Sequence, residues 1–146
     1  MYLLRCALFL AAVLVSAAPA PSSAIAPQQQ TAETATGFYL RWRTTALNAK
    51  SMDEITPFWT ADTVHEFNME PESAKADTLT MLKRVYGTQT GVKVVKETAT
   101  PDGATLSLEG MDAAHTPLVS SVDIVKENGA WKITGAVERW KPKGND

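Results

Sequence analysis

The sequence predicts an α+β fold, with a four-strand antiparallel meander in the last third of the chain and helices upstream that cover one of its faces. Three turn signals divide the meander, which runs from Val92 to Trp140. They are Pro101-Asp102-Gly103, the stretch from Gly110 to Pro117, and Asn128-Gly129. Asn-Gly between apolar-rich runs is the strongest short hairpin signal, because a type I′ turn needs positive φ at both central residues. The segments before Val92 instead carry apolar residues at helical spacing.

Apolar residues at this spacing predict a long first helix from about Thr34 to Ala49. They are Phe38, Trp42, Ala46 and Ala49. The stretch from Ser51 to Glu54 has the form of a capping box, so a second, short helix is predicted to start at Met52. Proline fits poorly inside a helix. This short helix therefore ends or kinks near Thr56, or Thr56 caps a new turn that begins at Pro57.

A short strand and a third helix are predicted next. The strand covers Thr63 to Phe67, where β-branched and aromatic residues gather. Pro71 ends this strand and opens a helix from about Glu72 to Tyr86. Its apolar stripe consists of Leu79, Leu82 and Tyr86, widened by Met81 and Val85. Gly87 is a natural residue just beyond the C-terminus of that helix.

The Asn128-Gly129 turn fixes the register of the last hairpin. Counting outward from it pairs Ile124 with Ile133 and Val122 with Gly135. The face that carries Ile124 and Ile133 is the more apolar, so we expect it to meet the helices. A glycine in the middle of a strand predicts a bulge or a sharp bend at Gly135.

The N-terminal stretch predicts export. A weakly positive start is followed by an apolar run from Cys6 to Ala18, about 13 residues, whereas a membrane-spanning helix needs roughly 20. Ser22-Ser23-Ala24 is the expected cleavage site, and Cys6 precedes the apolar run, which is the wrong place for lipidation. We therefore expect a signal peptide over 1–24, a spacer over 25–33, one domain over 34–141 and a tail over 142–146. The mature protein is expected in the periplasm or outside the cell.

Composition excludes few function classes, and those it disfavours are nucleic-acid and metal binding. The chain has 146 residues, a net charge of -2 and no basic run, so nothing favours a nucleic-acid partner electrostatically. Cys6 is its only cysteine, and the two histidines, His65 and His115, lie 50 residues apart. We expect no disulfide, no metal site and no cofactor.

The order of these elements resembles the nuclear-transport-factor-2-like superfamily. The resemblance covers about 34–140. It rests on that order, on Trp59-Thr60-Ala61-Asp62-Thr63-Val64, and on the closing Asn-Gly hairpin with its aromatic Trp140. It implies a cone in which a curved sheet, completed by the short strand, wraps around the long first helix, and it is closest to the small exported members. The fold hosts many functions, so it does not itself imply one.

The resemblance also suggests candidate catalytic residues. Thr63-Val64-His65-Glu66 is similar to the Thr-Val-acid-acid segment of the steroid isomerases, which places Glu66 at the position of the base, with His65 beside it. Tyr39 stands at the position of the helix-one phenol. The expected inward face of the penultimate strand carries no carboxyl group to complete an oxyanion hole, because Asp123 falls on the opposite face.

Two functions therefore remain open. The favoured one is a non-enzymatic module that binds a small apolar molecule or a protein through the cone cavity or the outer sheet face; a homodimer through the sheet is compatible with it. The alternative is an isomerase, dehydratase or cyclase with Glu66 or His65 as base and Tyr39 as donor. Most aromatic residues are expected to fill the core. The residues expected to line a ligand cavity are Trp42, Trp59, Phe67, Tyr86 and Met111.

Overall fold

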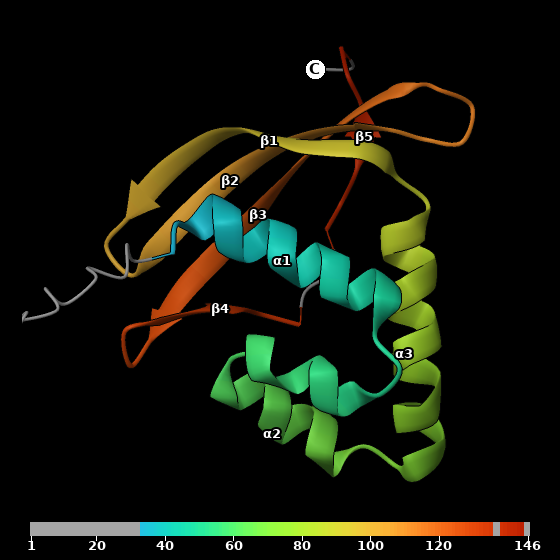
Figure 1. Ribbon diagram of the computed structural model, residues 1–146, viewed down its shortest axis with the longest axis vertical. Coiled ribbons are helices and arrows are strands. Elements are labelled where there is room, and N and C mark those ends of the chain that lie inside the picture. Colours follow the sequence, from blue (N-terminus) through green and yellow to red (C-terminus); the bar gives the residue numbers. More distant parts are fainter. Residues whose placement is uncertain (1–32, 136–137, 145–146) are drawn as a thin grey trace, which may run out of the picture. The chain divides into compact units, whose positions relative to one another are not determined.

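An antiparallel sheet forms the C-terminal half of the fold in the computed structural model, which describes residues 33–135 and 138–144. Within these residues, four strands pair in sequence order, and a fifth short strand pairs with the third. The strands are β1 (Thr90–Thr100), β2 (Gly103–Met111), β3 (Pro117–Glu127), β4 (Ala130–Ile133) and β5 (Lys141–Pro142). The sheet is curved and does not close on itself (Figure 1). The predicted α+β class and the meander are confirmed.

The closing hairpin has the predicted turn and register near its tip. Asn128 and Gly129 both have positive φ, 51° and 80°, as a type I′ turn requires, and Ile124 pairs with Ile133. β4 ends there, so the predicted pair of Val122 with Gly135 does not form among the described residues. Beyond a bend at Gly135, β5 pairs with β3 in a register shifted by three residues.

Three α-helices and two short 3-10 turns precede the sheet in the described part of the chain. The helices are α1 (Ala35–Asn48), α2 (Ala61–Met69) and α3 (Glu72–Gly87), and the turns are η1 (Met52–Glu54) and η2 (Thr56–Phe58). α1 begins as predicted, because the Thr34 hydroxyl accepts a hydrogen bond from the Gly37 N–H. Pro57 lies in the first positions of η2. Ser51 makes no side-chain cap, and Glu54 accepts instead from the Lys50 N–H at 3.0 Å.

The strand predicted at Thr63–Phe67 is wrong, because these residues belong to α2. The Thr60 hydroxyl accepts a hydrogen bond from the Thr63 N–H, and Asp62 lies in the positive first turn of the helix. The Glu127 carboxylate adds a second cap by accepting from the Ala61 N–H at 3.0 Å. Capping thus outweighs the strand propensity of Thr63 and Val64.

The third helix is confirmed, with a different end. α3 extends through Gly87, and Thr88 follows it in a right-handed conformation (φ -77°). Gly87 is therefore the last helical residue and not the left-handed residue beyond the helix that we expected. Leu82 and Tyr86 on the predicted stripe are buried.

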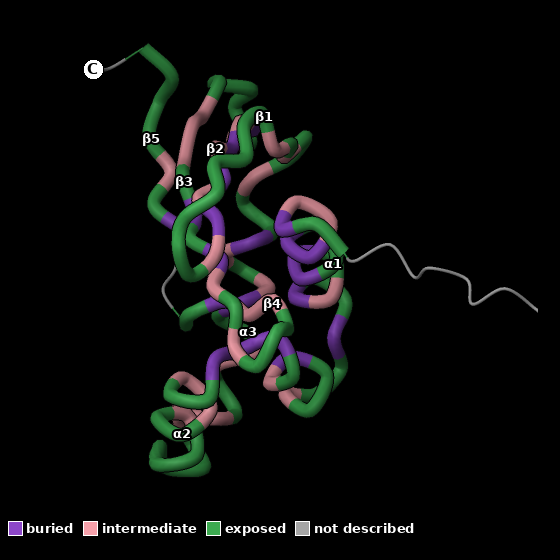
Figure 2. Tube along the Cα trace, turned by 90° about the vertical axis from the view of Figure 1, so that its left-hand side faces the viewer, coloured by how far each residue is buried: buried purple, intermediate pink, exposed green. Residues whose placement is uncertain are grey.

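The core lies between α1 and the central strands. Along β2 every second side chain is buried, including Leu106 and Leu108, and Ile124 and Ile133 face the same side. Figure 2 shows burial concentrated in α1 and these strands, whereas α2 has no buried residue. Six aromatic residues are buried, as expected for a core: Phe38, Tyr39, Trp42, Phe58, Trp59 and Tyr86. Each contributes a large apolar area, worth roughly 1.5–3 kcal/mol for a fully buried side chain.

The predictions for the N-terminal stretch concern residues that the structure does not describe. The signal peptide over 1–24, its cleavage near Ala24 and nearly all of the spacer fall in 1–32, outside the described residues. Among the helices that are described, none is long and apolar enough to cross a membrane.

Candidate functional site

The structure separates the predicted catalytic residues. Glu66 and His65 are exposed on α2. Tyr39 is fully buried on α1, where its hydroxyl donates to the Glu138 carboxylate at 2.7 Å. Glu66 was expected on a strand, but it lies on α2 with its side chain exposed. The proposed acid–base pair of Glu66 and Tyr39 is therefore not assembled.

A buried polar cluster, here called the Glu138 cluster, consists of Tyr39, Arg43, Glu138 and Trp140. The carboxylate accepts from the Tyr39 hydroxyl and, at 2.9 Å, from the Trp140 indole N–H. The Arg43 guanidinium lies 3.9 Å from it. Arg43 also donates to the carbonyl oxygens of Tyr86 (2.6 Å) and Gln89 (2.9 Å). The cluster thus joins the C-terminal segment to α1 and to the end of α3.

Burial dominates the electrostatics of this cluster. It raises the pKa of Glu138, against the opposing effects of the Tyr39 hydrogen bond and the Arg43 charge. Burial, together with the Glu138 carboxylate, also raises the pKa of Tyr39 and raises the pKa of Tyr86 to about 12. Both phenols therefore stay protonated near neutral pH. The Tyr39 hydroxyl donates to Glu138, whereas the Tyr86 hydroxyl accepts from the Trp42 indole N–H. With its oxygens already bonded and its side chain 1% exposed, Glu138 serves to hold the fold.

Sequence reasoning missed this cluster for two reasons. If the register of the last hairpin continued unchanged, Glu138 would lie on the face opposite Ile124 and Ile133, but the bend at Gly135 breaks that register. Arg43 is not part of the apolar stripe predicted for the first helix, yet it is 7% exposed. A signal was present, because Arg43 follows Tyr39 by four residues and so shares its side of the helix. The carboxylate that contacts Tyr39 thus comes from Glu138 in the C-terminal segment and not from the penultimate strand.

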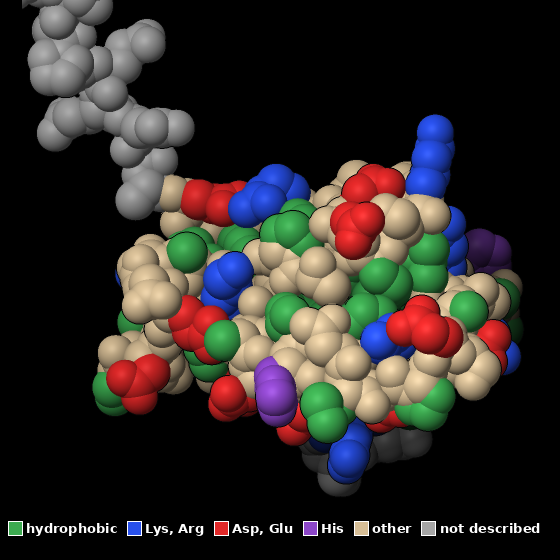
Figure 3. Space-filling view, turned by 90° about the horizontal axis from the view of Figure 1, so that it is seen from below, with side chains coloured by type: hydrophobic (Ala, Val, Ile, Leu, Met, Phe, Trp, Pro, Cys, Tyr) green, Lys and Arg blue, Asp and Glu red, His purple; other side chains and the backbone are tan. Residues whose placement is uncertain are grey.

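An open cleft of about 580 Å³, here called the α2–α3 cleft, lies between α2, α3 and the ends of β3 and β4. Its apolar lining consists of Trp59, Phe67, Met81, Leu82 and Val125. The rings of Trp59 and Phe67 meet edge to face, with centroids 5.5 Å apart. Figure 3, viewed from the end where α2 lies in Figure 1, shows acidic, basic and hydrophobic side chains interspersed on this face. Threonine side chains and Gly135 complete the wall.

The cleft is acidic. Its lining contains four carboxyl groups and no lysine or arginine: Asp62, Glu66, Glu70 and Glu127. Asp62, Glu66 and Glu70 follow one another at intervals of four residues, which places them along one side of α2. Within the described residues, these three carboxylates make no ion pair or side-chain hydrogen bond, whereas Glu127 caps α2. The Lys75 ammonium lies 6.0 Å from the centre of the Phe67 ring and pairs with Glu72.

The predicted ligand-binding residues lie in three places. Trp59 and Phe67 meet in the α2–α3 cleft. Trp42 and Tyr86 are buried, with the Trp42 indole N–H 3.3 Å from the Tyr86 hydroxyl oxygen. Met111 lines a separate hollow at the far end of β2. Of these five residues, only Trp59 and Phe67 therefore line the same pocket.

Neither a metal site among the described residues nor a known relative points to the function of the cleft. In the described part of the chain, no group of three or more His, Cys, Asp or Glu residues is placed to hold a metal ion. No protein-family model, curated protein or solved structure matches the chain.

Proposed function

We propose that this protein is an exported, non-enzymatic binding module whose α2–α3 cleft receives a small molecule with an apolar body and a cationic group. The observation that carries the proposal is the lining of the cleft, in which apolar side chains are surrounded by carboxylates without a compensating cation. The export part rests on the N-terminal sequence. We also propose a distant relationship to the nuclear-transport-factor-2-like superfamily, supported by the long first helix that packs against a curved antiparallel sheet; α2 stands where the resemblance implied a short strand.

The apolar part of the cleft suits a flat or branched hydrocarbon group. Trp59 and Leu82 are almost fully buried, so they form a firm floor, while Phe67 is half-buried and Met81 is 39% exposed. A ligand that covers Phe67 and Met81 removes exposed apolar area from water, which favours binding. The volume of about 580 Å³ is in the range of small-molecule pockets.

The acidic side of the cleft selects the charge of the ligand. Carboxylates four residues apart on a helix repel each other, at a cost of about 0.2–0.5 kcal/mol for each pair. Glu70 adds to this cost, because it caps the C-terminal end of α2, where the helix dipole is negative. A cationic group near Glu66 and Glu70 would relieve this repulsion. The arrangement is unfavourable for the free protein and favourable for a complex with a cation.

Calorimetric titration with 2-naphthylmethylammonium tests this proposal. We expect saturable binding that weakens as salt is added, because the rim carboxylates are exposed. Glu66→Gln should weaken binding about 3-fold, and Glu66→Gln with Glu70→Gln about 10-fold, the range of solvent-exposed charge pairs. Asp53→Asn is the matched control: it removes one exposed negative charge from η1, outside the cleft.

The proposal fails if all variants bind the probe equally, because the carboxylates of the cleft would then not contribute. It also fails if neutral 2-naphthylmethanol binds as tightly as the ammonium compound. That result would indicate a purely apolar site.

A further inference from the structure

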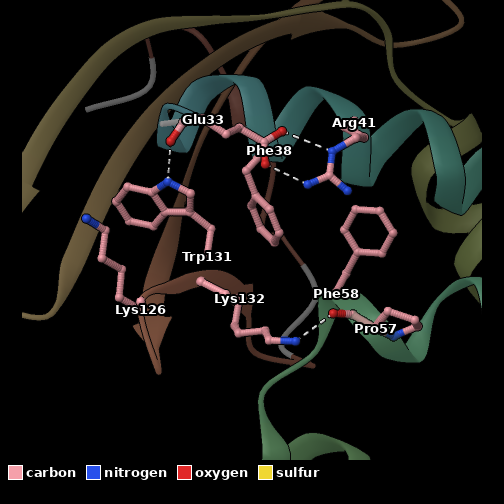
Figure 4. A pocket seen from close by; sticks show the side chains of 10 residues that line it. Glu33, Phe38, Arg41, Pro57, Phe58, Lys126, Trp131 and Lys132 are labelled. Atoms are coloured by element: carbon pink, nitrogen blue, oxygen red, sulfur yellow. Dashed lines mark hydrogen bonds and ion pairs between the residues drawn. The ribbon is translucent and has the colours of Figure 1, made fainter. Parts of the chain in front are cut away.

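A second hollow of about 390 Å³ lies between the start of α1, η2 and the β3–β4 hairpin. We call it the hairpin groove. Figure 4 shows Trp131 and Phe58 on opposite sides of it, Phe38 between them, and Lys132 running below toward Pro57. Its ligand chemistry is independent of the α2–α3 cleft, because the two linings share no residue.

Aromatic rings form the walls of the hairpin groove and are held in place. Phe38 and Phe58 are buried, with ring centroids 5.7 Å apart. The Trp131 indole N–H donates to the Glu33 carbonyl oxygen at 2.6 Å, which fixes the ring against the start of α1. A preformed set of ring faces and edges suits a flat aromatic group, since little side-chain freedom is lost on binding.

The charges around the hairpin groove leave two cations without a carboxylate. Arg41 and Glu33 form a two-bond ion pair, at 3.0 and 2.6 Å, and neutralise each other. Lys126 lies 4.4 Å from the centre of the Trp131 ring. The half-buried Lys132 donates to the Pro57 carbonyl oxygen at 2.7 Å. Among the described residues, neither lysine has an acidic side chain within ion-pair distance, so the lining is positive by two charges.

We propose that the hairpin groove binds a small anion carried on a flat aromatic body, of the aromatic carboxylate class. The ring lies between Trp131 and the two phenylalanines. The carboxylate accepts hydrogen bonds from the Lys132 ammonium, which has three N–H groups and uses one of them on Pro57. Lys126, whose ammonium lies over the Trp131 ring at 4.4 Å from its centre, supplies the second positive charge.

Calorimetric titration of the purified protein with 2-naphthoate, and with 2-naphthamide as the uncharged analogue, tests this inference. We expect 2-naphthoate to bind saturably and at least about 10-fold more tightly than 2-naphthamide, as a charge-assisted contact predicts. Lys132→Gln and Lys126→Gln should each weaken 2-naphthoate binding about 3-fold or more, without changing 2-naphthamide binding. Lys96→Gln on the exposed surface of β1 is the matched control.

Lys132→Gln also removes the hydrogen bond to Pro57, which holds the hairpin. Lys126→Gln leaves that hydrogen bond in place and therefore provides an independent test. Equal affinity for 2-naphthoate and 2-naphthamide would overturn the inference. So would equal 2-naphthoate affinity in the Lys126→Gln and Lys96→Gln proteins, and so would the absence of saturable binding.

Discussion

Glu138 and the carboxylates on the rim of the α2–α3 cleft show two opposite uses of negative charge in one small fold. Glu138 is buried and accepts from Tyr39 and Trp140, with Arg43 nearby. Glu66 and Glu70 are exposed and have no cationic partner in the described residues. The first arrangement uses charge within the fold. The second leaves it available for a ligand.

The same contrast distinguishes the cations. Arg43 is surrounded by carbonyl oxygens and Glu138, so its charge is used within the fold. Lys132 in the hairpin groove bonds only one neutral carbonyl oxygen among the described residues. Partnered charges should therefore control stability, and unpartnered charges should control binding. Variants that remove a partnered charge and variants that remove an unpartnered charge test this division.

Arg43→Met should have the largest effect on stability. The variant leaves Glu138 buried without its nearby cation and leaves two carbonyl oxygens without their donor. Breaking a buried ion pair from one side costs about 3–5 kcal/mol, and we expect a loss of this order in urea unfolding at pH 7. Arg84→Met, which removes an exposed arginine from α3, should cost less than about 1 kcal/mol. Equal stability of the two variants would contradict a structural role for the Glu138 cluster.

The stability contributed by Glu138 should depend on pH. Its pKa is raised in the folded protein, above the ordinary value of 4.5, so the folded state holds this proton more tightly than the unfolded state. That contribution is fully present below about pH 4.5 and is lost as the pH rises through the folded-state pKa. Measured from pH 4 to 8, the stability of the wild type relative to Glu138→Gln should therefore fall. A difference that is constant with pH, or that grows, would mean that Arg43 and the hydrogen bonds outweigh burial.

Glu66→Gln should have the smallest effect on stability and a clear effect on binding. Removing one charge from the acidic side of α2 relieves repulsion, so the protein should be unchanged or more stable by up to about 0.5 kcal/mol. Thermal unfolding measures this. A loss of more than 1 kcal/mol would show that Glu66 has a structural partner and would remove the contrast with Arg43.

The sequence predicted the elements whose local signals agree with their tertiary environment. Asn128-Gly129 specified its turn, and Ile124 and Ile133 specified the core face. Thr63 to Phe67 was mispredicted, because the capping of α2 comes partly from Glu127, a residue far away in the sequence. A local sequence pattern cannot predict that contact.

The candidate sites were less predictable than the fold for a related reason. Trp59 and Phe67 line the α2–α3 cleft, whose acidic side depends on Glu66 being helical. The Glu138 cluster depends on the bend at Gly135, where the Thr63 side chain occupies the space that a Cβ would need and its hydroxyl accepts the Gly135 N–H. Both sites therefore arise from contacts between α2 and the end of β4.

Mapping the binding of 2-naphthylmethylammonium by heteronuclear NMR tests whether the α2–α3 cleft receives a cationic ligand. Each tryptophan indole N–H gives its own signal, assigned with single Trp→Phe variants, and Trp59 and Trp131 line different pockets. We expect the cationic probe to shift the Trp59 indole signal and the backbone signals of Thr63 and Thr134, and to leave the Trp131 signal unchanged. A probe that shifts Trp131 instead, or shifts no tryptophan at saturating concentration, would contradict the α2–α3 cleft as a site for cationic ligands.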